Sequence, residues 1–258
     1  MTKLDEIVAW KKEELALRKR ERPPAQLEQA LKTRPPTRSF REAIARPGRV
    51  NLIAEIKKVS PSAGPIRPGA DVLEIAKIYQ EAGAQAISVL TDEKFFSGSL
   101  SDLSRVREKV SLPVLRKDFL LEEYMVLEGA AAGADAVLLI AAILPRDVLK
   151  RLIRLAGDLS LAALVEVHTE PELDAALEAG AEILGVNNRD LGTLRVDLKT
   201  TERLFRRIPD GKVRVSESGI RSREDVEFVR TQGANAVLIG EELMSAADPG
   251  QRIREMIG

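Results

Sequence analysis

The stretch AAGADAVLLI (131–140) reads as the end of a helix, a turn and a buried strand, and it decides the fold because the chain repeats it. The same pattern returns as EAGAQAISVL (81–90), EAGAEILGVN (178–187) and TQGANAVLIG (231–240). In each copy a glycine stands where a helix end needs a residue free to adopt positive φ, and alanine and an apolar run follow. The glycines are 50, 47 and 53 residues apart, about twice the length of one strand-plus-helix unit. We therefore predict one further strand between successive copies.

Apolar runs of strand length do lie in these gaps, at SLPVLRKDF (111–119), LAALVEVH (161–168) and GKVRVSES (211–218), and RVNLIAEIKK (49–58) precedes the first copy. Eight short strands alternating with amphipathic helices predict a single α/β domain of the (β/α)8 TIM barrel type. A doubly wound open sheet and a solenoid are the alternatives. The strand count favours the barrel, and solenoid repeats carry a side-chain signature that these copies lack.

Residues 1–48 precede the first strand and predict a helical extension that packs on the barrel of residues 49–258, the two forming one domain. Thr2 and Asp5 have the spacing of a capping box at the start of a helix. The apolar positions of this helix fall near one face, at Leu4, Ile7, Val8 and Leu15.

The amino-acid composition limits the classes of partner that can be expected. The chain has 40 basic and 40 acidic residues, so its net charge gives no reason to expect nucleic acid or an anionic membrane as partner. It has no cysteine, which excludes disulfides and thiol nucleophiles, and no apolar run approaches the ~18 residues of a membrane span. We expect a cytoplasmic protein, and its polar helices favour a monomer.

Ionisable side chains gather where the predicted strands end, although barrel interiors are normally apolar. Any one Glu–Lys couple among them has the simpler interpretation of a structural ion pair. The whole set would be costly to desolvate without a ligand, and it offers acid and base groups with shifted pKa values. Its ionisable members are Glu55, Lys57, Lys117, Glu166, Arg189 and Glu217, and the polar residues Asn187 and Ser218 accompany them.

Glycines follow the last two predicted strands, in ESGI (217–220) and LIG (238–240). Barrels often hold phosphate at this position, because small residues expose backbone N–H groups beside a helix N-terminus. The pattern favours a phosphorylated small-molecule substrate. His168 is the only histidine, which excludes a multi-histidine metal site, and we expect it to be structural.

Six segments, each at a strand end, closely resemble the indole-3-glycerol-phosphate synthase family, and the likeness extends over the barrel and the helical extension. The segments are AEIK (54–57) together with SPS (60–62), then LTDEKFFSGS (90–99), RKDF (116–119), VEV (165–167), GVNNRDL (185–191) and ESGI (217–220).

The resemblance implies the ring-closing step of tryptophan biosynthesis, in which 1-(2-carboxyphenylamino)-1-deoxyribulose 5-phosphate loses carbon dioxide and water. It implies no cofactor and no metal. Lys117 matches the family's general acid, and Glu166 matches the carboxylate that assists proton transfer in dehydration. Lys57 matches a lysine that contacts substrate and, in some proposals, donates the dehydration proton.

The remaining family positions are supporting or substrate-binding ones. Glu55, Asn187, Glu217 and Ser218 match the supporting polar network, and Arg189 matches a residue near the anthranilate carboxylate. The expected substrate contacts, besides Arg189, are Ser60, Leu90, Phe96, Phe119, Gly219, Ile239, Gly240 and Glu241.

Glu241 departs from the family pattern, because some members carry serine after the last glycine. We expect the backbone N–H groups of Gly219, Gly240 and Glu241 to bind the phosphate, with the Glu241 side chain turned away.

Two other functions stay open from the residues alone. A class I aldolase would use Lys117 or Lys57 to form a Schiff base with a phosphorylated ketose. A non-catalytic barrel that binds a phosphorylated ligand would use the charged strand ends as an ion-pair network. Phosphoribosylanthranilate isomerase is less suitable, since its general base is typically a cysteine.

Overall fold

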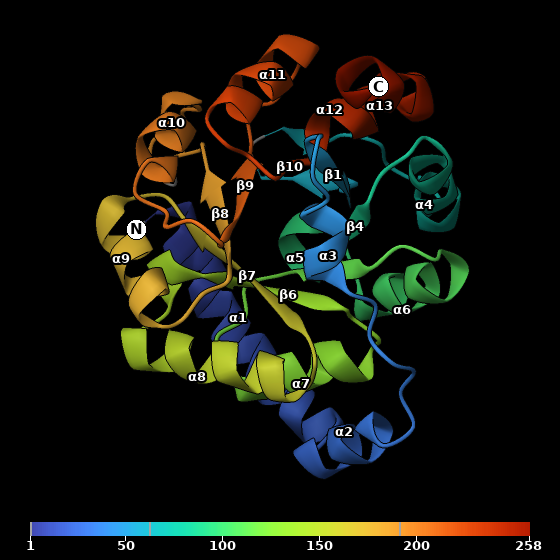
Figure 1. The fold of residues 1–258 in the computed structure, drawn as a ribbon. Helices are drawn as coiled ribbons and strands as arrows, with labels where there is room; N and C mark the ends of the chain where they lie inside the picture. The colour runs from blue at the N-terminus through green and yellow to red at the C-terminus, as the bar shows by residue number, and fades with distance from the viewer. Residues whose placement is uncertain (1, 62, 191) are drawn as a thin grey trace.

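Eight parallel strands close into a barrel in the computed structural model, which describes residues 2–61, 63–190 and 192–258 (Figure 1). The first strand pairs in parallel with both the second and the last, which closes the sheet. The predicted (β/α)8 barrel is confirmed, and the doubly wound sheet and the solenoid are wrong. The barrel strands are β1 (Asn51–Ile56), β4 (Ala86–Leu90), β5 (Val114–Lys117), β6 (Ala136–Ile140), β7 (Ala162–Val167), β8 (Ile183–Asn187), β9 (Val213–Glu217) and β10 (Ala236–Ile239).

Helices surround the barrel (Figure 1), and several of them begin at a capping residue. The side chains of Asp71, Thr169 and Ser222 each accept a backbone N–H of the first turn that follows them. The main helices around the barrel are α4 (Val72–Glu81), α6 (Leu100–Lys109), α7 (Glu123–Ala131), α8 (Arg146–Asp158), α9 (Glu170–Glu178), α10 (Lys199–Phe205), α11 (Arg223–Thr231) and α13 (Pro249–Ile257). Shorter pieces are the β2 (Val59–Ser60) and β3 (Gly64–Pro65) hairpin, α5 (Glu93–Phe96), η1 (Ala141–Ile143) and α12 (Glu241–Ser245).

The repeated glycines end four of these helices in the left-handed conformation. Gly83, Gly133, Gly180 and Gly233 have φ of 97°, 90°, 89° and 91°. An L side chain rarely adopts this backbone geometry, so glycine lets the chain leave the helix and enter the next strand within three residues. The repeat found in the sequence is thus a repeated helix-to-strand turn.

The barrel interior is apolar at its amino-terminal end and charged at its carboxyl-terminal end. Strand side chains alternate in direction, so residues two apart share a face. Buried Leu115 is followed on the same face by Lys117, and buried Leu164 by Glu166. The inward-facing side chains at the carboxyl-terminal ends of these strands are therefore ionisable. They lie directly above the packed apolar side chains, which form the floor of this end of the barrel.

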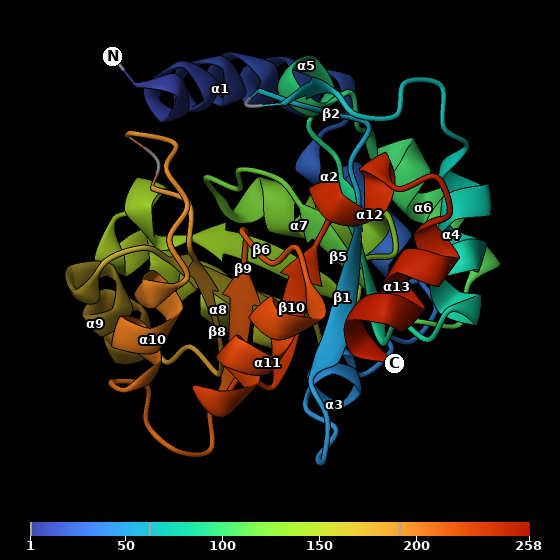
Figure 2. The same ribbon diagram turned by 90° about the horizontal axis from the view of Figure 1, so that it is seen from above.

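The amino-terminal segment contributes helices to both ends of the barrel: α1 (Lys3–Glu21), α2 (Pro24–Leu31) and α3 (Phe40–Ile44). Figure 2 shows α1 lying across the carboxyl-terminal ends of the strands, with α3 at the opposite end. The predicted Thr2–Asp5 capping box is present at the start of α1. The residues of α1 that are buried are Ile7, Lys11 and Leu15, so the stripe that was expected to be apolar contains a lysine.

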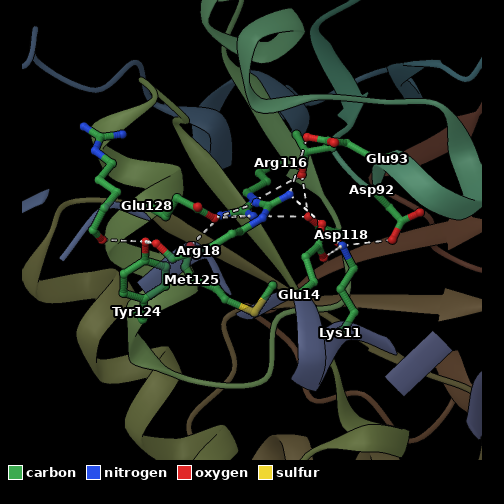
Figure 3. A network of polar contacts seen from close by, with 12 residues as sticks. Lys11, Glu14, Arg18, Asp92, Glu93, Arg116, Asp118, Tyr124, Met125 and Glu128 are labelled. Atoms are coloured by element: carbon green, nitrogen blue, oxygen red, sulfur yellow. Dashed lines mark hydrogen bonds and ion pairs between the residues drawn. The ribbon is translucent and has the colours of Figure 1, made fainter. Parts of the chain in front are cut away.

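Lys11 is completely buried and is surrounded by carboxylates (Figure 3). Its Nζ lies 2.7 Å from Glu14 Oε2, 2.8 Å from Asp92 Oδ2 and 2.8 Å from Asp118 Oδ1. Burial by itself lowers the pKa of Lys11, but Asp118 and Asp92 outweigh it and raise that pKa above its ordinary value. The lysine therefore fixes α1 to the ends of β4 and β5 as a charged group.

Arg116 continues this network on the outward face of β5 (Figure 3). Its Nη2 lies 3.1 Å from Asp118 Oδ2 and 2.9 Å from Glu128 Oε2, and its Nη1 donates to the carbonyl of Met125 at 2.6 Å. Arg18 of α1 reaches the same Glu128 at 3.1 Å. We call this largely buried group the α1 network: Lys11, Glu14, Arg18, Asp92, Arg116, Asp118 and Glu128.

Candidate active site

A cavity of about 490 Å³ opens at the carboxyl-terminal ends of the strands, beneath α1. All sixteen residues proposed from the sequence as catalytic or substrate-binding line this cavity. They come from strands and loops far apart in the chain, so the barrel brings them together. Two residues of the family segments, Ser62 and Leu191, lie outside the described residues.

Glu55 and Lys57 project from the end of β1, and Lys57 Nζ lies 3.0 Å from Glu55 Oε1. Glu55 is buried against Gly240. A Cβ at residue 240 would lie 2.4 Å from Glu55 Oε1, closer than real Cβ contacts occur. Glycine at position 240 therefore does more than leave its backbone open to a ligand. It also leaves room for the Glu55 carboxylate.

Lys117 stands at the end of β5 among three glutamates. Its Nζ lies 3.3 Å from Glu166 Oε2 and 4.0 Å from Glu217 Oε2. Burial by itself lowers the pKa of Lys117, but Glu166, Glu217 and Glu55 outweigh it and raise that pKa well above the ordinary value. The side chain is therefore an ammonium ion at neutral pH and can donate a proton into the cavity.

Glu166 and Glu217 are both buried, yet their pKa values move in opposite directions. Burial raises the pKa of Glu166, but Lys117 and His168 outweigh it and hold the pKa below its ordinary value. Burial and the neighbouring charge of Glu166 hold the pKa of Glu217 well above its ordinary value. The two carboxyl groups are hydrogen-bonded, as expected when one proton is shared by a pair that cannot both ionise.

Gly185 makes room for this pair and was missed from the sequence as a site residue. It lies inside β8, and a Cβ there would lie 2.1 Å from Glu217 Oε1. A glycine in the middle of a strand often marks a close approach by another group, which is the signal that could have found it.

Asn187 ends β8, and Arg189 follows it at the edge of the cavity. The Asn187 side chain hydrogen-bonds to Glu166 and accepts the backbone N–H of Arg189 at 3.0 Å. Arg189 Nη2 lies 3.8 Å from Glu241 Oε2. This carboxylate faces an arginine that lines the cavity, and the expectation that the Glu241 side chain turns away from a bound phosphate stays a prediction.

The turn after β9 holds two consecutive residues in the left-handed region. Ser218 has φ of 64° and Gly219 has φ of 81°. A Cβ at Gly219 would lie 2.3 Å from Val196 Cγ1, so glycine is required there. Asn188, missed from the sequence, braces the turn by donating to the carbonyls of Glu217 and Ser218 at 3.0 Å each. A non-glycine residue at positive φ is costly, and such strain is typical of functional sites.

The remaining walls of the cavity are mostly apolar. The Phe96 and Phe119 rings lie 6.0 Å apart with an interplanar angle of 38°. The sequence reasoning missed the contributions of β6 and α1, although strand alternation could have found the first. These further lining residues include Leu138 and Ile140 of β6 and Lys3, Leu4 and Ile7 of α1.

Residues 2–61, 63–190 and 192–258 contain no group of three or more His, Asp or Glu side chains placed to hold a metal ion. Within the same part of the chain, none of the helices has both the length and the apolar character needed to cross a bilayer.

The family model described as "Indole-3-glycerol phosphate synthase" matches residues 4–256. The chain belongs to the indole-3-glycerol phosphate synthase family. Among its relatives, the indole-3-glycerol phosphate synthase of Caldanaerobacter subterraneus subsp. tengcongensis is 48% identical over 254 residues, covering 98% of this chain and 97% of the relative. The indole-3-glycerol phosphate synthase of Syntrophobacter fumaroxidans is 45% identical over 257 residues, covering 99% and 97%.

Solved structures outside the family share the fold. 3-Hexulose-6-phosphate synthase from Salmonella typhimurium matches with a TM-score of 0.63 at 17% identity, covering 80% of this chain and 96% of that one. Thiamine phosphate pyrophosphorylase from Pyrococcus furiosus matches with a TM-score of 0.61 at 18% identity, covering 80% and 93%. At these identities the likeness shows the barrel alone.

Proposed function

We infer that this chain is a carboxy-lyase that converts 1-(2-carboxyphenylamino)-1-deoxyribulose 5-phosphate into indole-3-glycerol phosphate, carbon dioxide and water. Family membership over residues 4–256 supports this inference. The observation that carries it is the position of Lys117, an ammonium ion held over an apolar floor against a glutamate pair that shares one proton. Ring closure needs an acid at the substrate carbonyl, and the later loss of water needs a second proton.

We propose that Lys117 is the acid of ring closure. The aromatic carbon that bears the carboxyl group attacks the ribulose carbonyl carbon, and Lys117 gives its proton to the carbonyl oxygen, which becomes a hydroxyl group. The C–C bond to the carboxylate then breaks and its electron pair restores the aromatic ring as carbon dioxide leaves. The cluster of glutamates returns a proton to Lys117, since they raise its pKa.

For dehydration we propose that Glu166 takes the proton that the new ring gives up while the hydroxyl leaves as water with a proton from an acid. Lys57, paired with Glu55, is the candidate for that acid, because it follows β1, the strand opposite β7 in the barrel, and β7 carries Glu166. Asn187, Glu217 and Ser218 would hold these groups in place.

The two anionic ends of the substrate need separate sites. We propose that backbone N–H groups of Gly219, Gly240 and Glu241 bind the phosphate, at the glycine-containing exits of β9 and β10. Arg189 would pair with the anthranilate carboxylate, exchanging its contact with Glu241 for the substrate.

Apolar side chains would hold the anthranilate ring between these ends. We propose that Leu90, Phe96, Phe119 and Ile239 enclose the ring, with Ser60 at the loop side of the cavity. A desolvated ring site also strengthens the nearby charge interactions that the reaction uses.

We propose that the extension and the barrel act as one functional unit and that the protein works as a monomer. Support comes from α1, whose Leu4 and Ile7 line the same cavity as the residues at the strand ends. The cavity is thus assembled from a single chain.

The aldolase alternative receives no support from Lys117. A Schiff-base lysine attacks as the neutral amine and needs a lowered pKa, whereas the glutamates around Lys117 raise it.

The test is to follow indole fluorescence after mixing the protein with the carboxyphenylamino-deoxyribulose phosphate, for wild type, Lys117→Ala and Lys212→Ala. Lys212 forms an ion pair with Glu182 at the surface, so its removal is the matched control. We expect product from wild type and from the control, and a loss of about 10²- to 10⁴-fold in Lys117→Ala. A folded wild type that forms no product would refute the function, and full activity in Lys117→Ala would move the acid to Lys57.

A further inference from the structure

The only histidine of the chain lies behind Glu166, at the end of β7 and away from the cavity lining. His168 is 9% exposed. Its Nε2 lies 3.5 Å from Glu166 Oε1, and its Nδ1 lies 3.2 Å from Glu172 Oε2. The imidazole ring therefore stands between two carboxylates, one that faces the substrate cavity and one on α9.

Glu172 determines which ring nitrogen carries a proton. Its Oε2 also accepts the backbone N–H of His168 at 2.7 Å, so the carboxylate is fixed in place. An ionised carboxylate can only accept, which places a proton on Nδ1. Nε2 then faces Glu166 Oε1 and has no other hydrogen-bond partner among the residues that the structure describes.

The contact between His168 Nε2 and Glu166 Oε1 is unfavourable unless a proton lies between the two atoms. A neutral ring would point the Nε2 lone pair at a carboxylate oxygen in a buried site, where the repulsion is poorly screened. A proton between Nε2 and Oε1 turns the repulsion into a charge-assisted hydrogen bond. Glu166 Oε2 is occupied differently, by Lys117 Nζ at 3.3 Å, so the two oxygens have distinct partners.

We propose that His168 is a positioning residue for the reaction, which holds a proton against Glu166 Oε1 and so leaves Oε2 as the oxygen that exchanges protons. This inference rests on the proposed function, because it gives Glu166 a part in dehydration. His168 itself does not touch the substrate and acts through Glu166.

The charged groups around the ring support the protonated form. Glu166 of β7 and Glu172 of α9 face it directly, Asp190 of the loop after β8 interacts with it electrostatically, and Lys117 of β5 opposes its charge. Burial by itself lowers the pKa of His168, but the Glu172 hydrogen bond and the charge of Glu166 outweigh it and raise that pKa. The ring in turn helps to keep Glu166 ionised.

A titration tests the pairing without using activity. The ring ¹⁵N resonances of a single histidine need no assignment, provided that the protein carries no histidine tag. We expect His168 to titrate above its ordinary value of about 6.5, and Glu166→Gln to lower the midpoint by about half a unit or more. Glu178→Gln, an exposed change on α9, should leave the midpoint unmoved. A wild-type midpoint at or below the ordinary value, or one that Glu166→Gln does not change, overturns the pairing.

Kinetics test the positioning role, with His168→Leu and His168→Gln compared over a range of pH. We expect His168→Leu to lower kcat by up to about 100-fold with little change in KM. The acid limb of its kcat/KM profile should move to higher pH, because Glu166 loses a positive neighbour and becomes easier to protonate. His168→Gln should recover part of kcat, because its amide can still donate to Oε1, while its acid limb stays displaced.

A merely structural histidine would behave differently. Both variants would then lose thermal stability in proportion to activity, and the acid limb would stay in place, which overturns the proposal. A wild type without turnover would instead refute the proposed function, and the titration would still decide whether His168 and Glu166 share a proton.

Discussion

The two buried charge clusters of this molecule meet at the end of β5 and differ in how completely their charges are paired. Arg116 and Asp118 belong to the α1 network, and Lys117, the residue between them, belongs to the group at the cavity mouth. Because strand side chains alternate in direction, three consecutive residues serve two clusters. We call Glu55, Lys57, Lys117, Glu166 and Glu217 the mouth cluster.

Each carboxylate of the α1 network lies close to a cation. Glu14 and Asp92 lie within 2.8 Å of Lys11 Nζ, while Glu128 has an arginine nitrogen at 2.9 Å. In the mouth cluster, Glu217 lies 4.0 Å from Lys117 and is hydrogen-bonded to another carboxyl group. Paired charges hold a structure rigid, whereas unevenly paired charges leave protons that can move. We therefore assign a stabilising role to the α1 network and a catalytic role to the mouth cluster.

Arg116→Met should give the largest effect, because it leaves buried Asp118 and Glu128 with fewer cations. We expect the free energy of unfolding to fall by about 3–5 kcal/mol. Urea unfolding followed by circular dichroism measures it. Arg207→Met, which removes exposed pairs with Glu170 and Asp174, should cost less than about 1 kcal/mol. Equal losses in the two variants would mean that the α1 network does not stabilise the fold.

The barrel and its site could be predicted from local patterns, whereas the α1 network could not. Glycine at the end of each helix and alternation along each strand are properties of neighbouring residues, and they placed Lys117 and Glu166 at the strand ends. Lys11 was missed because its partners Asp92 and Asp118 are remote in sequence, and a lysine in an apolar stripe carries no local sign that it is buried. His168 was expected to be structural for the same reason: only the fold brings Nε2 to Glu166.

Gly185→Ala should disturb the mouth cluster and leave the α1 network intact. Its new Cβ would displace the Glu217 carboxylate, and a displacement of about 1 Å can cost about 100-fold in kcat. Steady-state turnover measures the loss. Gly157→Ala, at an open position in α8, should leave kcat unchanged and stabilise the protein by about 0.5–1 kcal/mol. Unchanged turnover in Gly185→Ala would show that the position of Glu217 does not matter.

We expect the smallest effect in the pH dependence of the free energy of unfolding. A carboxyl group of the α1 network and one of the mouth cluster change this free energy in opposite directions as the pH rises. Burial raises the pKa of Asp118, but Lys11 and Arg116 outweigh it and lower that pKa, so its stabilising contribution is present above the unfolded value and lost as the pH falls through the folded one. Burial and Glu166 raise the pKa of Glu217, so its contribution is present below the unfolded value and lost as the pH rises through the folded one.

Glu217→Gln should therefore reduce the decline in unfolding free energy between mildly acidic and alkaline pH, because the amide keeps the donor and cannot ionise. Urea unfolding over the pH series measures this slope. The exposed change Glu178→Gln should leave the slope as it is in wild type. A slope that is also unaltered in Glu217→Gln would contradict the shared proton.

The most direct measurement compares Lys11→Met with Lys117→Met, each assayed for urea unfolding and for turnover. Lys12→Met, an exposed neighbour of Lys11, is the control for both. We predict that Lys11→Met loses about 3–5 kcal/mol of unfolding free energy. Lys117→Met should lose about 10²- to 10⁴-fold in kcat while losing less than about 1 kcal/mol at mildly acidic pH, where its glutamates can take up a proton. If Lys117→Met instead destabilises the fold as much as Lys11→Met and keeps its turnover, the division between a structural and a catalytic cluster is wrong.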